Sequence, residues 1–201
     1  MKLFSKTLLS NYFFIFFLSF SIIMGSSYNT YLSYERFYNA DSETYMNIAK
    51  FDFKEQSLIR RYRVIIPALA YFVSQPISKV YYNVFKDKRD KYDWPLLTGF
   101  FLINSLLLSL ATVLIYRIMK FKEIGELGCI VGLCIFLTGG RWASFIAGHP
   151  TTDSLTIVCI AAIVYGLIAS QKILLAAGII LGLLSKESVG FFFSDDFTIC
   201  Q

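Results

Sequence analysis

Charged residues are scarce in this sequence. Only 16% of its 201 residues are Asp, Glu, Lys or Arg, against about 25% in an ordinary soluble domain. Hydrophobic residues make up 56%, and the mean hydropathy is +0.57. A soluble chain of this length could not bury so much apolar surface, so most of it should face lipid. Basic and acidic residues are also mixed, which argues against a nucleic-acid partner.

Motifs of soluble enzyme chemistry are missing as well. The sequence contains no P-loop, dinucleotide fingerprint, nucleophile elbow or HExxH motif. Its four cysteines have no CxxC spacing and it has a single histidine, so neither a disulfide framework nor a zinc site is predicted. We expect Cys129, Cys134 and Cys159, which lie in apolar runs, to be small buried hydrophobes. No cofactor is expected, although a divalent cation would be compatible with the acidic residues discussed below.

Long apolar runs divide the chain. They predict an all-α fold: a polytopic transmembrane helical bundle of about five spans, with a membrane-surface helical external loop, in a single membrane domain over residues 1–201. We expect the first span at 7–25, the external loop at 26–94, four further spans within 95–189 and a tail at 190–201. The lipid bilayer is therefore the first partner that the sequence predicts.

The orientation follows from the distribution of Lys and Arg. Lys2 and Lys6 precede the first span, so the N-terminus should be cytoplasmic and the protein multi-pass in the plasma (inner) membrane. A basic start, an apolar run and small residues at 25–27 also fit a cleavable signal peptide. We favour an uncleaved span because the run is long for a signal peptide and more spans follow.

Residues 64–80 form the ambiguous element. Their apolar run is short for a crossing, because Ser74, Gln75 and Pro76 interrupt it. We therefore predict a helix that lies along the membrane surface. In the rival topology this segment crosses and every later element inverts. The first topology alone places the charged residues considered below on one side of the membrane.

More than half of the charged residues fall between positions 35 and 93. Asp41 and Tyr45 share one helical face with Ile48 and Ala49, and the cluster Arg60, Arg61 and Arg63 follows. Carboxylates and clustered guanidinium groups suit a phosphorylated, hydroxylated ligand. Two other interpretations stay open: Asp41 as a helix N-cap, and the arginines as contacts for lipid headgroups.

Polar residues recur beside the later spans. Placing a polar or charged group in a membrane costs free energy, so such residues often have a functional role. Arg141 follows a glycine pair, Asp153 follows His149 and two threonines, and Lys186 and Glu187 end the last apolar run. Each also has a structural interpretation. Asp153 would cap a helix, the lone histidine would be an ordinary loop residue, and Lys186 with Glu187 would be a solvated helix end.

Together these segments resemble the polytopic GT-C glycosyltransferases, in particular the mannosyltransferase-like and lipid A aminoarabinose-transferase-like members. The resemblance rests on D-x-x-x-Y at 41–45, R-x-x-x-P at 63–67, HPTTD at 149–153 and SKES at 185–188. It implies transfer of a sugar from a polyprenyl-phosphate donor to an acceptor on the outer face.

The resemblance also implies roles for particular residues. Asp41 would be the catalytic base, and Arg63 with Arg60 would hold the donor phosphate. The remaining candidate substrate-binding residues on the outer face are Tyr45, Arg141, His149, Asp153, Lys186 and Glu187. The family has more than five spans, and Asp195 and Asp196 interrupt the next expected one. We therefore expect the N-terminal part of such an enzyme, with a tail that departs from the family pattern. Two states stay open: an active enzyme, and a fragment that is inactive alone.

Two other functional classes compete with this hypothesis. In one, the chain is a non-enzymatic membrane subunit or lipid-binding protein in which the arginines contact anionic lipid. In the other it is a secondary transporter, which would place polar or broken helices at the bilayer midplane in repeated halves. No internal repeat is present, and Asn104 is the one polar residue near the middle of a predicted span.

Overall fold

The computed structural model describes residues 2–34, 40–54, 60, 62–84 and 93–186. All regular structure within these ranges is helical, which confirms the predicted all-α class. The helices are α1 (Lys2–Leu32), α2 (Ala40–Ala49), α4 (Ile65–Val84), α5 (Trp94–Phe121), α6 (Glu126–Thr138), the 3-10 turn η2 (Gly139–Arg141), α7 (Trp142–Gly148), α8 (Asp153–Ile168) and α9 (Lys172–Ser185).

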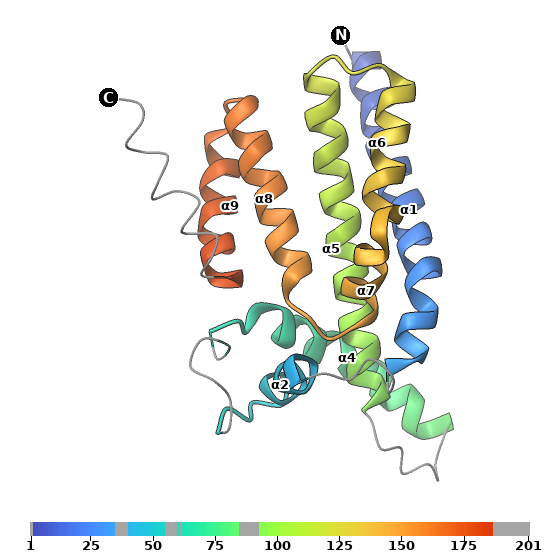
Figure 1. Cartoon of the computed structure of the whole chain (residues 1–201), viewed down its shortest axis with the longest axis vertical. Coiled ribbons are helices and arrows are strands. Elements are labelled where there is room, and N and C mark those ends of the chain that lie inside the picture. The colour runs from blue at the N-terminus through green and yellow to red at the C-terminus, as the bar shows by residue number, and fades with distance from the viewer. Residues whose placement is uncertain (1, 35–39, 55–59, 61, 85–92, 187–201) are drawn as a thin grey trace.

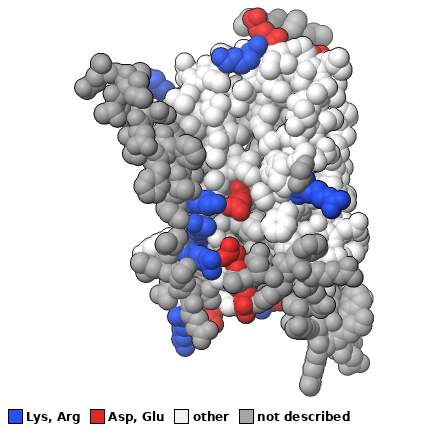
Figure 2. Space-filling model, in the orientation of Figure 1, with Lys and Arg blue, Asp and Glu red and all other residues white. Residues whose placement is uncertain are grey.

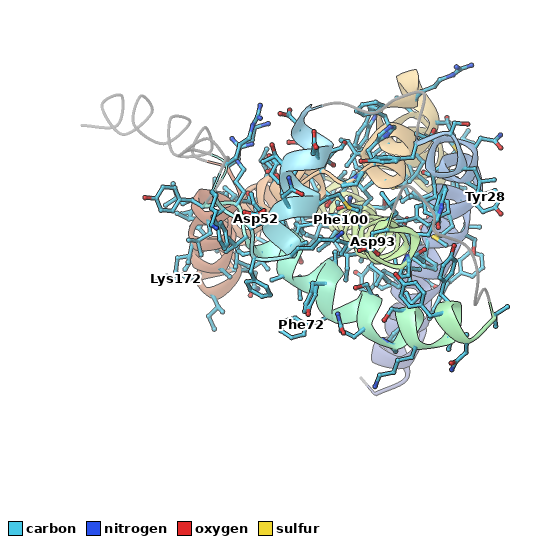
Figure 3. All side chains as sticks on the ribbon, turned by 90° about the horizontal axis from the view of Figure 1, so that it is seen from below. Tyr28, Asp52, Phe72, Asp93, Phe100 and Lys172 are labelled. Atoms are coloured by element: carbon cyan, nitrogen blue, oxygen red, sulfur yellow. The ribbon has the colours of Figure 1, made fainter. Side chains whose placement is uncertain are left out.

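Five parts of the chain run side by side with alternating direction: α1, α5, the α6–α7 pair, α8 and α9 (Figure 1). Helix α5 is central and packs against α1, α7 and α8, whereas α9 packs mainly against α8. Helices α2 and α4 lie across one end of this bundle, drawn at the bottom of Figure 1. Seen from that end, α2 and α4 lie nearest the viewer, beside Asp93 at the start of α5 and Phe100 within it (Figure 3).

Two helices are long and apolar enough to cross a membrane, over Asn11–Leu32 and Trp94–Phe121. A third crossing is reached if α6 and α7, which bend by 53° at their junction, form one span. Helices α8 and α9 are apolar but only 16 and 14 residues long, short of the about 20 residues that a straight crossing needs. The structure therefore supports a membrane protein with two or three candidate spans, and the predicted five are not confirmed.

Three helices differ in extent from the apolar runs of the sequence. Helix α1 continues past residue 25 to Leu32, because Tyr31 stacks on Phe101 of α5 and extends the packed surface by two turns. Residues 142–148 form the short helix α7. Helix α4 runs through Pro76 without a break. Because α4 contains Ser, Gln, Asn and Lys side chains, it is not among the helices that are apolar enough to span a membrane.

The crossing of α4 over α5 explains how the lower end is built. Tyr45 of α2, Ile66 of α4, Phe100 of α5 and Leu155 of α8 belong to one buried cluster. The two long helices approach closely because Gly99 has no side chain: a Cβ there would overlap the backbone carbonyl of Ala70. Small residues at this contact thus hold α4 crosswise.

The start of α5 is fixed by its own capping group. The Asp93 carboxylate accepts a hydrogen bond from the Leu96 amide at 3.2 Å, and a proline follows in the first turn, where its missing N–H costs nothing. The same carboxylate pairs with Lys50 at 2.9 Å. Asp93 therefore joins the end of α2 to the beginning of α5.

The cysteines only partly follow the sequence prediction. Cys129 and Cys159 are buried free thiols, as expected. Cys134 is exposed on the apolar surface of α6, so its expected burial was wrong. In a helix with apolar residues on every side, composition does not distinguish the face that packs inward from the face that does not.

Candidate functional site

The first pair of candidate residues lies at the start of α2. Asp41 is the second residue of the helix and forms an ion pair with Arg60, from the segment that precedes α4. The helix already begins at Ala40, so Asp41 is not the residue before it, as the N-cap interpretation required. In the first turn its charge still interacts favourably with the helix N-terminus. Its side chain is 53% exposed, so it is accessible to a ligand.

The second pair lies one helical turn further along α2. Tyr45 is buried, and its hydroxyl accepts a hydrogen bond from Nη1 of Arg63 at 3.0 Å. Tyr45, Ile48 and Ala49 are buried, as the sequence pattern indicated, whereas Asp41, which was predicted on the same face, is exposed. Both described arginines of the cluster therefore contact α2, while Arg61 lies outside the described residues.

The third pair joins the last two helices. Lys186 donates a hydrogen bond from Nζ to Oδ1 of Asp153 at 3.0 Å, and both side chains are partly exposed. The predicted capping role of Asp153 was wrong, because Thr152 is the N-cap of α8 and Asp153 is the first helical residue. Nearby, the hydroxyls of Thr156 and Ser185 lie 3.1 Å apart. The end of α9 is thus held to the start of α8 by polar contacts.

These pairs border one region at the lower end of the molecule. Leu155, two residues after Asp153, belongs to the same buried cluster as Tyr45, so the start of α8 and α2 both border the core of this end. Figure 2 shows acidic and basic side chains mixed over this end and a largely uncharged band above it. We define the charged end as Asp41, Arg60, Arg63, Asp153 and Lys186.

His149 lies in the interior of the same end. Its ring is fully buried, stacks on Phe145 at 4.4 Å and lies 6.2 Å from the ring of Tyr34. Burial lowers the pKa of His149 below its ordinary value, and a hydrogen bond between Nδ1 and the Phe145 carbonyl at 3.1 Å partly opposes this. A neutral, enclosed imidazole supports the HPTTD turn rather than meeting a ligand at the surface.

Asn104 organises this turn, and its role was missed in the sequence. Its amide nitrogen donates to the carbonyls of Ile146 and His149 at 3.2 and 3.0 Å. Its oxygen accepts from the Ser154 hydroxyl at 2.6 Å. Asn104 is completely buried, and an amide within an apolar span was the signal that could have identified it.

One further candidate is not joined to the charged end, and another lies outside the described residues. Arg141 is exposed at the bend between α6 and α7, where its backbone has a φ of 61°. That left-handed conformation is uncommon outside glycine, and it makes the bend between the two helices. Glu187 lies outside the described residues. Among the residues that the structure does describe, no three His, Cys, Asp or Glu side chains converge on a possible metal ion.

Comparison with known proteins adds no relative to this picture. The chain matches no protein family, no curated protein and no solved structure.

Proposed function

We propose that this chain is a membrane glycosyltransferase-like protein of the GT-C type, which takes a sugar from a polyprenyl-phosphate donor. One observation carries the proposal: Asp41 and Tyr45, one turn apart on α2, are each joined to an arginine from the segment before α4. Acid, phenol and guanidinium groups are thereby assembled at the end of an apolar bundle. This is the chemistry that a lipid-linked sugar phosphate needs.

The proposed topology has five spans, with α8 and α9 as short crossings. In that arrangement the loop containing α2 and α4, the HPTTD turn and Lys186 all lie at one end of the bundle (Figure 1). The N-terminus and Lys120, Lys122 and Lys172 lie at the other end. The positive-inside rule makes that end cytoplasmic in a plasma membrane, so the charged end is external.

The reaction would use the ion pairs as exchangeable contacts. The donor phosphate binds Arg60 in place of Asp41, because a guanidinium binds two phosphate oxygens as readily as it binds a carboxylate. The freed Asp41 accepts the proton of the acceptor hydroxyl while that oxygen bonds to the sugar carbon. The bond from this carbon to the phosphate oxygen breaks, and the phosphate leaves with the electron pair. Arg63, oriented by Tyr45, stabilises the charge on the leaving phosphate.

The test is the substitution Asp41→Asn with Glu43→Gln as its matched control. Both acids lie in the first turn of α2 and both are exposed, so the two variants lose the same helix-terminal charge. Sugar transfer from a polyprenyl-phosphate donor, followed in proteoliposomes, should fall by about 10²-fold or more in the first variant. It should persist in the second. Equal transfer by Asp41→Asn and the unaltered chain would refute the assigned role.

A non-enzymatic, lipid-binding membrane subunit is the second candidate. It is favoured by the fact that Asp41 and Asp153 are already paired with cations, as in purely structural contacts. On this alternative Asp41→Asn leaves every activity unchanged and lowers stability by at most about 1 kcal/mol. The same pair of variants therefore distinguishes the two functions.

A further inference from the structure

An open apolar groove runs between α1 and α5, away from the charged end. Its volume is about 300 Å³, at the lower limit of small-ligand sites, which measure about 300–1,000 Å³. It is lined by Tyr12, Phe13, Phe16, Leu110 and Val113. These side chains are aromatic or aliphatic and lie on two helices that qualify as membrane spans. Such a groove fits a hydrocarbon chain.

A cation lies directly beyond this groove. The guanidinium of Arg117 lies 5.2 Å from the ring centre of Tyr12 and 4.8 Å from that of Tyr165. It makes no hydrogen bond or ion pair with a carboxylate among the residues that the structure describes, and its Nε is buried without a hydrogen-bond partner there. Aromatic faces attract a cation without using its N–H groups. Because the Arg117 side chain is partly exposed, its terminal N–H groups remain for an external acceptor.

Groove and cation form one continuous stripe. Leu110, Val113 and Arg117 follow the spacing i, i+3, i+7 and so share one face of α5. Tyr12 belongs to both parts, because it lines the groove and its ring faces Arg117. Arg117 lies about one turn before the end of α5 at Phe121. This is the depth at which a long basic side chain reaches the headgroup region.

We infer that Tyr12, Phe13, Phe16, Leu110, Val113 and Arg117 form a binding site for one anionic phospholipid. The acyl chain lies in the groove and the headgroup phosphate accepts hydrogen bonds from Arg117. The lipid belongs to the leaflet at the amino-terminal end of α1, opposite the charged end. The site depends on the chain spanning a membrane and is independent of the proposed sugar transfer.

Native mass spectrometry of the purified full chain in detergent tests the site. The probes are phosphatidylglycerol, phosphatidylcholine with the same acyl chains, and the chain-free headgroup glycerophosphoglycerol. The unaltered protein should prefer phosphatidylglycerol by about fivefold, since a basic residue near an anionic surface contributes about 1 kcal/mol. Glycerophosphoglycerol should not compete. Equal binding of the two lipids, or competition by the headgroup alone, would overturn the site without involving any variant.

Matched variants then separate the two parts of the site. Arg117→Gln should abolish the preference for the anionic lipid, whereas Lys122→Gln, which removes an exposed cation at the same end, should retain it. Val113→Trp should fill the groove and weaken both lipids several-fold, whereas Leu127→Trp on the exposed face of α6 should not. If both variants lost the preference for the anionic lipid equally, the preference would come from the overall positive charge of this end and not from Arg117, which would contradict the proposal.

Discussion

The two ends of the bundle handle their charges differently. At the lower end, Lys50 pairs with Asp93 and Lys186 with Asp153, across 43 and 33 positions of the sequence. At the upper end, Lys120 pairs with Glu126 in the adjoining turn, a sequence separation of only six residues. Arg117 meets aromatic rings instead of acids. The lower end is thus held together by long-range polar contacts, and the upper end by local ones.

This difference indicates which end can respond to a ligand. Partly exposed ion pairs between distant segments contribute little stability each, about 0–1 kcal/mol, so a phosphate can exchange with them at small cost. Their groups also come from α2, the segment before α4, α8 and α9, so a bound ligand would link several elements. The upper end has no such set among the described residues, and its features suit a lipid.

The largest contrast is expected from one added methyl group at each end. Gly99→Ala at the lower end would drive a Cβ into the Ala70 backbone, whereas Gly132→Ala at the upper end would meet only the flexible tip of Met119. Thermal unfolding in detergent should show Gly99→Ala destabilised by about 1–3 kcal/mol. Gly132→Ala should be neutral or stabilised, because alanine favours helix by about 1 kcal/mol over glycine. Equal stability of the two variants would show that α4 is not fixed by this crossing.

Much of the lower end could be predicted from the sequence, for a physical reason. The period of Tyr45, Ile48 and Ala49 identified the buried face of α2, and the polar residues of α4 distinguished it from a span. What could not be predicted depended on tertiary contacts. Asp153 looks like a cap locally, but Lys186, 33 residues later, provides a charge partner. The full length of α1 depended on a contact with α5, in which Tyr31, near the end of α1, stacks on Phe101.

The next effect concerns the buried amide that supports the lower end. Asn104→Leu removes the partner of the His149 carbonyl and of the Ser154 hydroxyl, and leaves the Ile146 carbonyl with only the Thr151 hydroxyl. A buried polar group left unsatisfied costs about 1–3 kcal/mol, so unfolding in denaturant should show a loss within that range, smaller than the contrast between the two glycine variants. Ser105→Ala is the control: its hydroxyl is equally buried but has no hydrogen-bond partner among the described residues. A loss in Ser105→Ala as large as in Asn104→Leu would assign the effect to packing alone.

The smallest effect is a pH dependence that should arise at the lower end alone. The sequence has one histidine, the side-chain type that ordinarily titrates between about pH 5 and 8. Because burial lowers the pKa of His149 from its ordinary 6.5, the unfolded chain binds the proton first. Stability should therefore be constant above about pH 7 and decline as the pH falls below 6.5, until the folded form is protonated as well. Thermal unfolding followed from pH 7.5 to 5 measures this decline. His149→Asn, which keeps a donor for the Phe145 carbonyl, should flatten it, and an unchanged slope in this variant would assign the titration to other groups.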